Sequence, residues 1–431
     1  MIKSIFRDDF IRSVSILAAG TGLAQMIYMV STPILTRLYT PEEFGIFSIY
    51  LSILYSISSL GSLSYEQAIP LPEKDRDAYL IFSLSIIINT FMAIVMILLM
   101  TMFWAPITEL LHIRSNILFM LLPLSFLGFG IFQSLTLWEL RKRNYTNVSK
   151  SKLTMNGSQA IVQSGLGFFS AGGLGLVAGE VLARAAGSLI MIRTFKWTMF
   201  REISLKEIYT VFVRYKRFPL LTTPAGLINA FTFHLPAFLI AFKFGAAEAG
   251  FLLMAQRLLS VPEALIGNSA TQVFTGQAAF LRKDNPGMVL KLFRSTLLKL
   301  GKVSIPLFLL GYVAAPALLP ALLGAEWSQA SFYFQWLSIF YLLQVLVNPI
   351  SRIFQIYEQQ KLQLLSEIIR STFIAVSSLV IFYSDMSPLN AIAILSVTGT
   401  AGYVLHGFLS WIAIQKGTDD DSLNAMNGQE V

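Results

Sequence analysis

The chain has 431 residues, of which 55% are hydrophobic and 13% are charged, with a formal net charge of +8 and no cysteine. Soluble domains carry about 25% charged residues, so this composition excludes an ordinary soluble protein. Apolar runs of about 20 residues, the length that spans a bilayer, recur from end to end and predict a polytopic membrane protein. The missing cysteines exclude disulfides, thiolate metal sites and a cysteine nucleophile.

Twelve apolar segments predict twelve transmembrane helices and an all-α fold, and the first is long enough to span rather than to act as a cleaved signal peptide. The predicted spans cover residues 14–35, 44–62, 79–103, 115–137, 153–171, 174–192, 219–242, 249–270, 303–324, 331–350, 364–384 and 388–414. The 153–171 span is the most polar, because it contains Asn156, Gln159 and Gln163. The tight turn GGLG that follows predicts a helical hairpin with the 174–192 span.

Lysine and arginine are distributed unevenly between the two sides of these spans. One side has only Arg37, Arg114 and Lys243, and two more, Arg184 and Arg257, lie within spans. The other 27 of the 32 basic residues, counting one at the inner end of the 364–384 span, lie on the side that carries both termini. The positive-inside rule therefore predicts cytoplasmic termini, and it accounts for the net charge without a nucleic-acid partner.

The longest link between spans, residues 193–218, divides the chain into two halves of six spans. We therefore expect an N-terminal six-helix lobe at 1–192 and a C-terminal six-helix lobe at 219–414. The link has apolar residues at helical spacing among basic ones, which predicts an amphipathic helix on the cytoplasmic face. The polar tail, residues 415–431, is predicted to be disordered.

The two halves show a weak internal repeat. A shift of 205 residues aligns Arg12 with Arg217, Glu43 with Glu248, and Gly45 with Gly250. Because each half begins inside and has six spans, we expect parallel repeats related by an axis along the membrane normal. Glycine and proline also interrupt the first span of each half, which is typical of a transporter's central site, although both are common in membrane helices.

Glu180 and Arg184 lie one helical turn apart inside the apolar 174–192 span. An arginine at mid-bilayer costs at least about 2.5–3.5 kcal/mol, so it should face the bundle interior or a watery cavity. One interpretation is a self-satisfied ion pair, since residues i and i+4 share a helix face. The other is a cation that receives an anionic substrate, for which guanidinium is suited because it binds phosphate oxygens in bidentate fashion.

Arg257 lies in the 249–270 span, about seven residues from its outer end. The positions three and four residues away are Leu253, Met254, Ser260 and Val261, so no acid lies next to it on the helix. An intramembrane arginine in such surroundings predicts a distant partner or a ligand.

Weaker candidates surround these arginines. His234, Asn229 and Gln25 are expected either to line a substrate cavity or to hold helices together, and Glu66 and Glu263 are candidates for a gate or for ion coupling. The sequence contains no GxxxxGK[ST], HExxH or GxSxG motif and no carboxylate cluster at a metal-ligand spacing. No catalytic residue, cofactor or metal site is therefore predicted.

The segments "PILTRLYTPEEFGIFSIYLSI" and "SYEQAI", together with twelve spans in two repeats, give the chain a family resemblance. It resembles the Wzx-type flippases of O-antigen and polysaccharide repeat units, within the multidrug/oligosaccharidyl-lipid/polysaccharide (MOP) exporter superfamily. The resemblance implies a MOP/MATE-like fold and a transporter, not an enzyme. It implies translocation of undecaprenyl-diphosphate-linked oligosaccharide across the bacterial inner membrane, for lipopolysaccharide, O-antigen or another surface polysaccharide.

The resemblance also implies a substrate cavity between the lobes with basic residues in it, which Arg184 and Arg257 would fit. The first two spans of each half commonly line that cavity, so Arg257 agrees with this better than Arg184 does. Functional partners of such flippases would be a polymerase and a chain-length regulator, besides membrane lipids.

Two other functions stay open from the sequence. A multidrug or cation antiporter on the same fold would favour acids in the cavity, and Arg257 argues against it. A membrane polysaccharide polymerase usually carries a large periplasmic loop, whereas every outer loop here is short.

Overall fold

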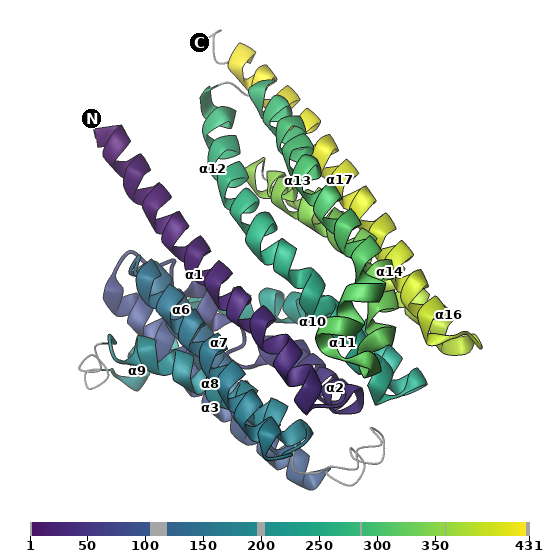
Figure 1. The fold of residues 1–431 in the computed structure, drawn as a ribbon. Helices are drawn as coiled ribbons and strands as arrows, with labels where there is room; N and C mark the ends of the chain where they lie inside the picture. The colour runs from purple at the N-terminus through teal and green to yellow at the C-terminus, as the bar shows by residue number, and fades with distance from the viewer. Residues whose placement is uncertain (1, 104–118, 196–202, 285–286, 358, 428–431) are drawn as a thin grey trace. The chain divides into compact units, whose positions relative to one another are not determined.

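A computed structural model describes residues 2–103, 119–195, 203–284, 287–357 and 359–427, and side chains are described from residue 19 to residue 417. The described segments are helical and contain no strand (Figure 1). The first half comprises α1 (Ile2–Leu38), α2 (Pro41–Ile57), α3 (Asp75–Met102), α6 (Leu122–Arg141), α7 (Tyr145–Phe168), α8 (Gly173–Ile192) and α9 (Leu205–Arg214). The second comprises α10 (Thr223–Phe244), α11 (Ala246–Pro262), α12 (Asn268–Asp284), α13 (Gly287–Leu323), α14 (Ser328–Ser351), α15 (Ile353–Ile356), α16 (Gln360–Tyr383) and α17 (Pro388–Asn427).

All twelve predicted spans fall on helices, apart from residues 115–118, which lie outside the described residues. Within the described residues, nine helical segments are long and apolar enough to cross a membrane. The other three predicted spans correspond to α1, α6 and α7. The all-α class predicted from the sequence is confirmed.

The polar residues that lower the hydropathy of the 153–171 span form hydrogen bonds between α7 and its neighbouring helices. Asn156 Nδ2 donates to the carbonyl of Ala24 in α1 at 2.8 Å, and Gln163 Nε2 donates to that of Leu176 in α8 at 2.8 Å. Side-chain hydrogen bonds of this kind hold membrane helices together, because lipid provides no hydrophobic force between them. The hairpin of α7 and α8 predicted from the GGLG turn is present.

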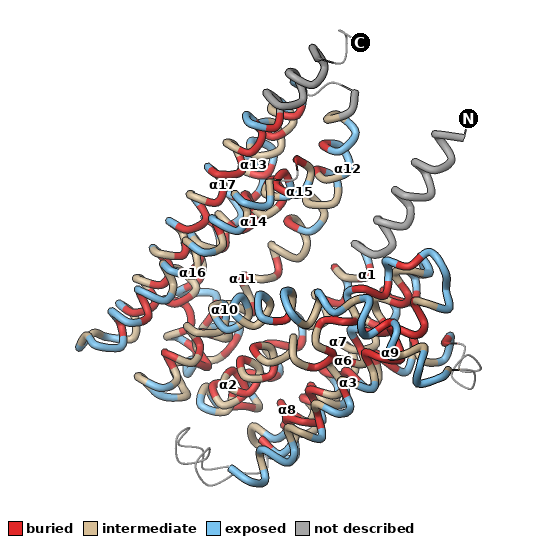
Figure 2. Tube along the Cα trace, turned by 180° about the vertical axis from the view of Figure 1, so that it is seen from behind, coloured by how far each residue is buried: buried red, intermediate tan, exposed pale blue. Residues whose placement is uncertain are grey.

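Contacts divide the chain into two compact units, residues 1–250 and 251–431. Helix α10 packs against α2 and therefore belongs to the first unit, although most of its residues are exposed or half-buried (Figure 2). The two lobes at 1–192 and 219–414 stay a prediction, as does the position of the 193–218 link at the membrane.

Two sequence expectations concern the segments outside the predicted lobes. The link contains a helix, α9, whose first turn is capped by Ser204 and Glu207 in a reciprocal capping box. The tail prediction is wrong for residues 415–427, because α17 continues to Asn427. Extending an existing helix costs far less than nucleating one, and this segment has no proline to stop it.

The starts of α2 and α11 meet at a close crossing within the first unit. A Cβ on Gly45 would lie 1.7 Å from the carbonyl oxygen of Ala246, and a Cβ on Gly250 would lie 2.0 Å from that of Pro41. The 205-residue shift converts one contact into the other, since it relates Pro41 to Ala246 and Gly45 to Gly250. Such a reciprocal contact is what a two-fold relation between equivalent segments produces.

Candidate functional site

Glu180 and Arg184 form a buried ion pair on α8. Their side chains are 7% and 8% exposed, respectively. Arg184 Nε donates to Glu180 Oε1 at 2.9 Å, and Nη2 donates to the same oxygen. The pair predicted from the i, i+4 spacing is therefore present.

Three further side chains complete what we call the Arg184 cluster: Tyr55, Phe129 and Gln159. Gln159 Nε2 donates to Glu180 Oε2 at 3.0 Å, and Arg184 Nη2 donates to the Tyr55 hydroxyl at 3.0 Å. The guanidinium carbon lies 4.7 Å from the centre of the Phe129 ring and 5.7 Å from that of Tyr55. Aromatic faces at these distances stabilise a cation in a low-dielectric site.

One nitrogen of the Arg184 guanidinium, Nη1, is available to a ligand. Arg184 Nη1 donates no hydrogen bond within the described residues and is not among the fully buried polar atoms. A ligand oxygen could therefore bind at Nη1 while Glu180 still holds the other side of the group.

His234 and Asn229 occupy different surroundings on α10. The His234 ring stacks on that of Tyr55, with ring centres 5.5 Å apart and planes 25° apart, so His234 contacts the Arg184 cluster through Tyr55. Asn229 is exposed and is not brought into the cluster by any described hydrogen bond. Gln25 on α1 is half-buried and already interacts with other groups of the chain.

Arg257 is buried on α11, with 5% of its surface exposed. It takes part in an interaction within the chain, so its burial is not evidence of a ligand. Because Arg257 belongs to the second unit and Arg184 to the first, a joint role for them stays a prediction.

Glu263 lies where the helix α11 changes register. Pro262 ends α11, and residues Glu263–Gly267 form a π turn, η5, before α12 begins. Single π turns of this type are frequent at functional sites. Asn348 Nδ2 on α14 donates to Glu263 Oε1 at 3.1 Å, so the carboxylate is held by a neutral partner.

Glu66 lies outside the spans, in the short 3₁₀ turn η2 (Tyr65–Ala68) after α2. The Ser62 hydroxyl donates to its carboxylate, and the neighbouring Tyr65 hydroxyl donates to the carbonyl of Phe212 in α9 at 2.9 Å. Burial raises the pKa of the Glu66 carboxyl above its usual range, while the Ser62 hydrogen bond lowers it. Glu66 thus lies beside the contact between this turn and α9.

Glu66→Gln is expected to remove a pH-dependent loss of stability. The unfolded carboxyl ionises at a pKa of about 4.3, whereas the folded one ionises at higher pH. Between the two values the wild-type Tm should fall as pH rises, because the unfolded state loses its proton first. The glutamine variant should lack this decline and match the wild type only at low pH. Thermal unfolding in detergent across the acidic range measures this, and parallel profiles for the two proteins would show that the burial of Glu66 has no such effect.

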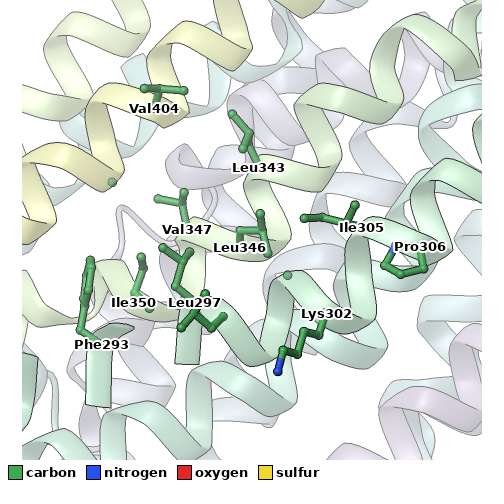
Figure 3. Close-up of a pocket in the computed structure, with 13 residues that line it drawn as sticks. Phe293, Leu297, Lys302, Ile305, Pro306, Leu343, Leu346, Val347, Ile350 and Val404 are labelled. Carbon is green, nitrogen blue, oxygen red and sulfur yellow. The ribbon is translucent and has the colours of Figure 1, made fainter. Parts of the chain in front are cut away.

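An apolar groove in the second unit lies against α13, α14 and α17, with a volume of about 790 Å³ (Figure 3). Leucine, isoleucine and valine side chains dominate its lining, and Lys302 is its one charged residue. A comparable groove of about 680 Å³ between α1 and α7 has no charged lining residue. These grooves have the chemistry that a hydrocarbon chain needs.

The sequence identified the charged members of the Arg184 cluster but not its aromatic members. Aromatic residues make up 13% of the chain, so nothing in the sequence distinguishes Tyr55 and Phe129 from the other aromatic residues. Gln159 was visible only as a polar residue in a weak span. Within the described residues, no group of three histidine, cysteine, aspartate or glutamate side chains could hold a metal ion.

Comparison with known proteins identifies the family. Residues 34–332 match the family of polysaccharide biosynthesis proteins. A curated relative, the succinoglycan biosynthesis transport protein ExoT of Rhizobium meliloti (strain 1021), is 24% identical over 311 residues. That alignment covers 70% of this chain, and the chain spans 60% of the length of the relative.

Two solved structures share the fold. An inward-facing multidrug resistance MATE family transporter of the MOP superfamily has a TM-score of 0.72 at 12% identity, over 92% of this chain and 96% of that one. The lipid II flippase MurJ, in an inward closed conformation, has a TM-score of 0.67 at 14% identity, over 95% of this chain and 90% of that one. These relatives are transporters and a flippase, not enzymes. The chain therefore belongs to the polysaccharide biosynthesis protein family and is a multi-pass membrane protein with the all-α fold of MOP-superfamily transporters.

Proposed function

We propose that this protein is a flippase that moves a polyprenyl-diphosphate-linked saccharide from the cytoplasmic to the periplasmic leaflet of the bacterial inner membrane. The observation that carries the proposal is the Arg184 cluster, a buried guanidinium with one nitrogen available to a ligand. Family membership supports a role in polysaccharide biosynthesis.

The Arg184 cluster stabilises a buried arginine in the absence of a bound anion. In the empty state Glu180 neutralises Arg184, and the rings of Tyr55 and Phe129 cover the guanidinium. A diphosphate oxygen accepts a hydrogen bond from Nη1, and this bond replaces part of the hydration that the ligand loses on entry. Charge-assisted hydrogen bonds from guanidinium to phosphate are about twice as strong as neutral ones.

Other features fit the remaining parts of the substrate. The groove between α1 and α7, which lies in the same unit as Arg184, is apolar enough for a prenyl chain. By the resemblance of the sequence, the substrate is an undecaprenyl-diphosphate-linked repeat unit for lipopolysaccharide O-antigen or a related surface polysaccharide. A polymerase and a chain-length regulator would then act on the same product, and both termini would be cytoplasmic.

If Arg257 contacts the substrate diphosphate, as its sequence position suggests, Arg257→Ala should abolish export of the saccharide while the protein remains in the membrane. Arg257→Lys should restore activity only in part, because a point charge replaces a guanidinium that can bind two oxygens at once. Surface polysaccharide in cells that express each variant measures the effect. If cells with a normal level of the alanine variant still make the wild-type amount of surface polysaccharide, Arg257 is not part of the substrate site.

The alternative is a multidrug or cation antiporter, which the likeness to MATE transporters favours. Purified protein in liposomes distinguishes the two functions. A flippase moves a labelled polyprenyl-diphosphate saccharide to the opposite leaflet without lengthening it, whereas an antiporter moves a labelled organic cation and leaves the lipid in place. Movement of the cation alone would contradict our proposal, and lengthening of the saccharide would indicate a polymerase.

A further inference from the structure

A second polar site lies wholly within residues 251–431. A pocket of about 330 Å³ is lined by residues of η5, α12, α14, α15, α16 and α17. Its charged and amide lining includes Glu263, Asn348, Arg352, Glu367, Arg370 and His406. Of these, Glu263, Asn348 and His406 lie within predicted spans, where such groups are costly and usually functional. The diphosphate contact at Arg184 does not use them.

Two of the charges in this pocket satisfy each other. Arg370 Nη1 lies 3.3 Å from Glu367 Oε1, and its Nη2 donates to the Tyr403 hydroxyl at 3.1 Å. The Arg370 guanidinium also lies 4.3 Å from the centre of the Tyr403 ring. The Glu367–Arg370 pair therefore lines one side of the pocket and contributes no net charge to it.

The other two charges remain for a ligand. Glu263 accepts hydrogen bonds from two neutral amides, that of Asn348 at 3.1 Å and that of Gln344. Arg352 is exposed at the end of α14, and within the described residues its side chain has neither a hydrogen bond nor an ion pair. Among the described residues, the pocket thus presents a carboxylate that only amides contact and a guanidinium without a hydrogen-bond partner.

The equal number of carboxylates and guanidiniums in the pocket indicates which kind of ligand it can bind. Two carboxylates oppose two guanidiniums, so neither a simple cation nor a simple anion gains from the whole lining. Sugar hydroxyls both donate and accept, which matches carboxylate and amide acceptors beside guanidinium and amide donors. The volume is at the small end of the roughly 300–1,000 Å³ range of ligand pockets, which fits one sugar rather than an entire oligosaccharide.

We propose that this pocket binds one sugar unit of the saccharide head group, an inference that rests on the proposed flippase function. Glu263 accepts hydrogen bonds from sugar hydroxyls, and Arg352 donates to hydroxyl or ring oxygens. His406 positions the lining, since its Nδ1 lies 2.7 Å from Ser366 Oγ and ties α17 to α16. The pocket would then select for the sugar.

Direct titration tests this assignment without lipid. The probe is the water-soluble saccharide released by mild acid from the lipid-linked saccharides of the producing cells, titrated calorimetrically into the full-length protein in detergent. The wild type should bind it, and Glu263→Gln and Arg352→Gln should each weaken binding at least about tenfold, as expected for a lost hydrogen bond to a charged group. Arg352 is exposed, and its side chain has no hydrogen bond or ion pair to lose within the described residues, so its variant should fold.

Gln335→Leu provides the matched control, because Gln335 is also on α14 but lies outside the pocket and donates to Tyr312. This variant should bind the saccharide as the wild type does. The assignment fails if the wild type does not bind the released saccharide, or if both pocket variants bind it as tightly as the wild type. Flipping by the wild type in liposomes, measured in parallel, separates these failures from a failure of the flippase proposal itself.

Discussion

Glu180→Ala is expected to destabilise the protein by about 3–5 kcal/mol, because it leaves the Arg184 guanidinium buried without its carboxylate. Both side chains of the pair are less than one-tenth exposed, so water can replace the lost carboxylate only in part. Gln159 would also lose the acceptor that it contacts at 3.0 Å. Thermal or denaturant unfolding in detergent measures the change in the free energy of unfolding.

The double variant Glu180→Gln/Arg184→Met is the matched control for this experiment. It removes both charges at similar volume, and such replacements of buried pairs are often neutral or stabilising. The double variant should therefore unfold near the wild-type transition while the single variant does not. Equal stability of the single variant and the wild type would mean that water or another group neutralises Arg184.

Gly45→Ala and Gly250→Ala should each destabilise the crossing of α2 and α11 by about 1–3 kcal/mol or more, the usual cost of overpacking a close contact. The added methyl groups would lie 1.7 Å and 2.0 Å from carbonyl oxygens of the opposing backbone, which cannot rotate away as a side chain can. The two helices must then separate. If the halves are related by a two-fold axis, the two variants should have similar effects.

Gly165→Ala on α7 provides a control with the opposite sign. A Cβ at this position meets nothing within 4 Å, so alanine should stabilise the helix by about 0.5–1 kcal/mol through its higher helix propensity. Melting temperatures of the three variants, with monodispersity checked by size exclusion, measure the contrast. A wild-type melting temperature for Gly45→Ala would show that the two backbones are not in close contact in the protein.

The helices were predictable because hydropathy acts over whole spans. The Glu180–Arg184 pair was predictable because its spacing is local. The ring contacts of Tyr55 and Phe129 were not, since they join α2, α6 and α8, whose packing the chain order does not reveal. The polar pocket was missed for the same reason, although Glu263 and Asn348, 85 positions apart, were each visible as polar residues within spans.

In the tail, residues 415–431, the sequence predicted too little structure. Its polar composition predicted disorder, but composition does not report that a long helix directly precedes it, and α17 extends to Asn427. Local propensity is a weak guide where a preceding helix is already formed.

Flipping by the Glu180→Gln/Arg184→Met protein tests the central claim most directly, because the variant removes the cation but is expected to keep the fold. In liposomes that contain a labelled polyprenyl-diphosphate saccharide, the wild type should move the lipid to the opposite leaflet. The double variant, shown to be folded by its thermal transition, should do so at least about tenfold more slowly, since each lost charge-assisted hydrogen bond contributes about 1.5–3 kcal/mol. Flipping at the wild-type rate by the folded double variant would contradict the account and leave Glu180 and Arg184 as a structural ion pair.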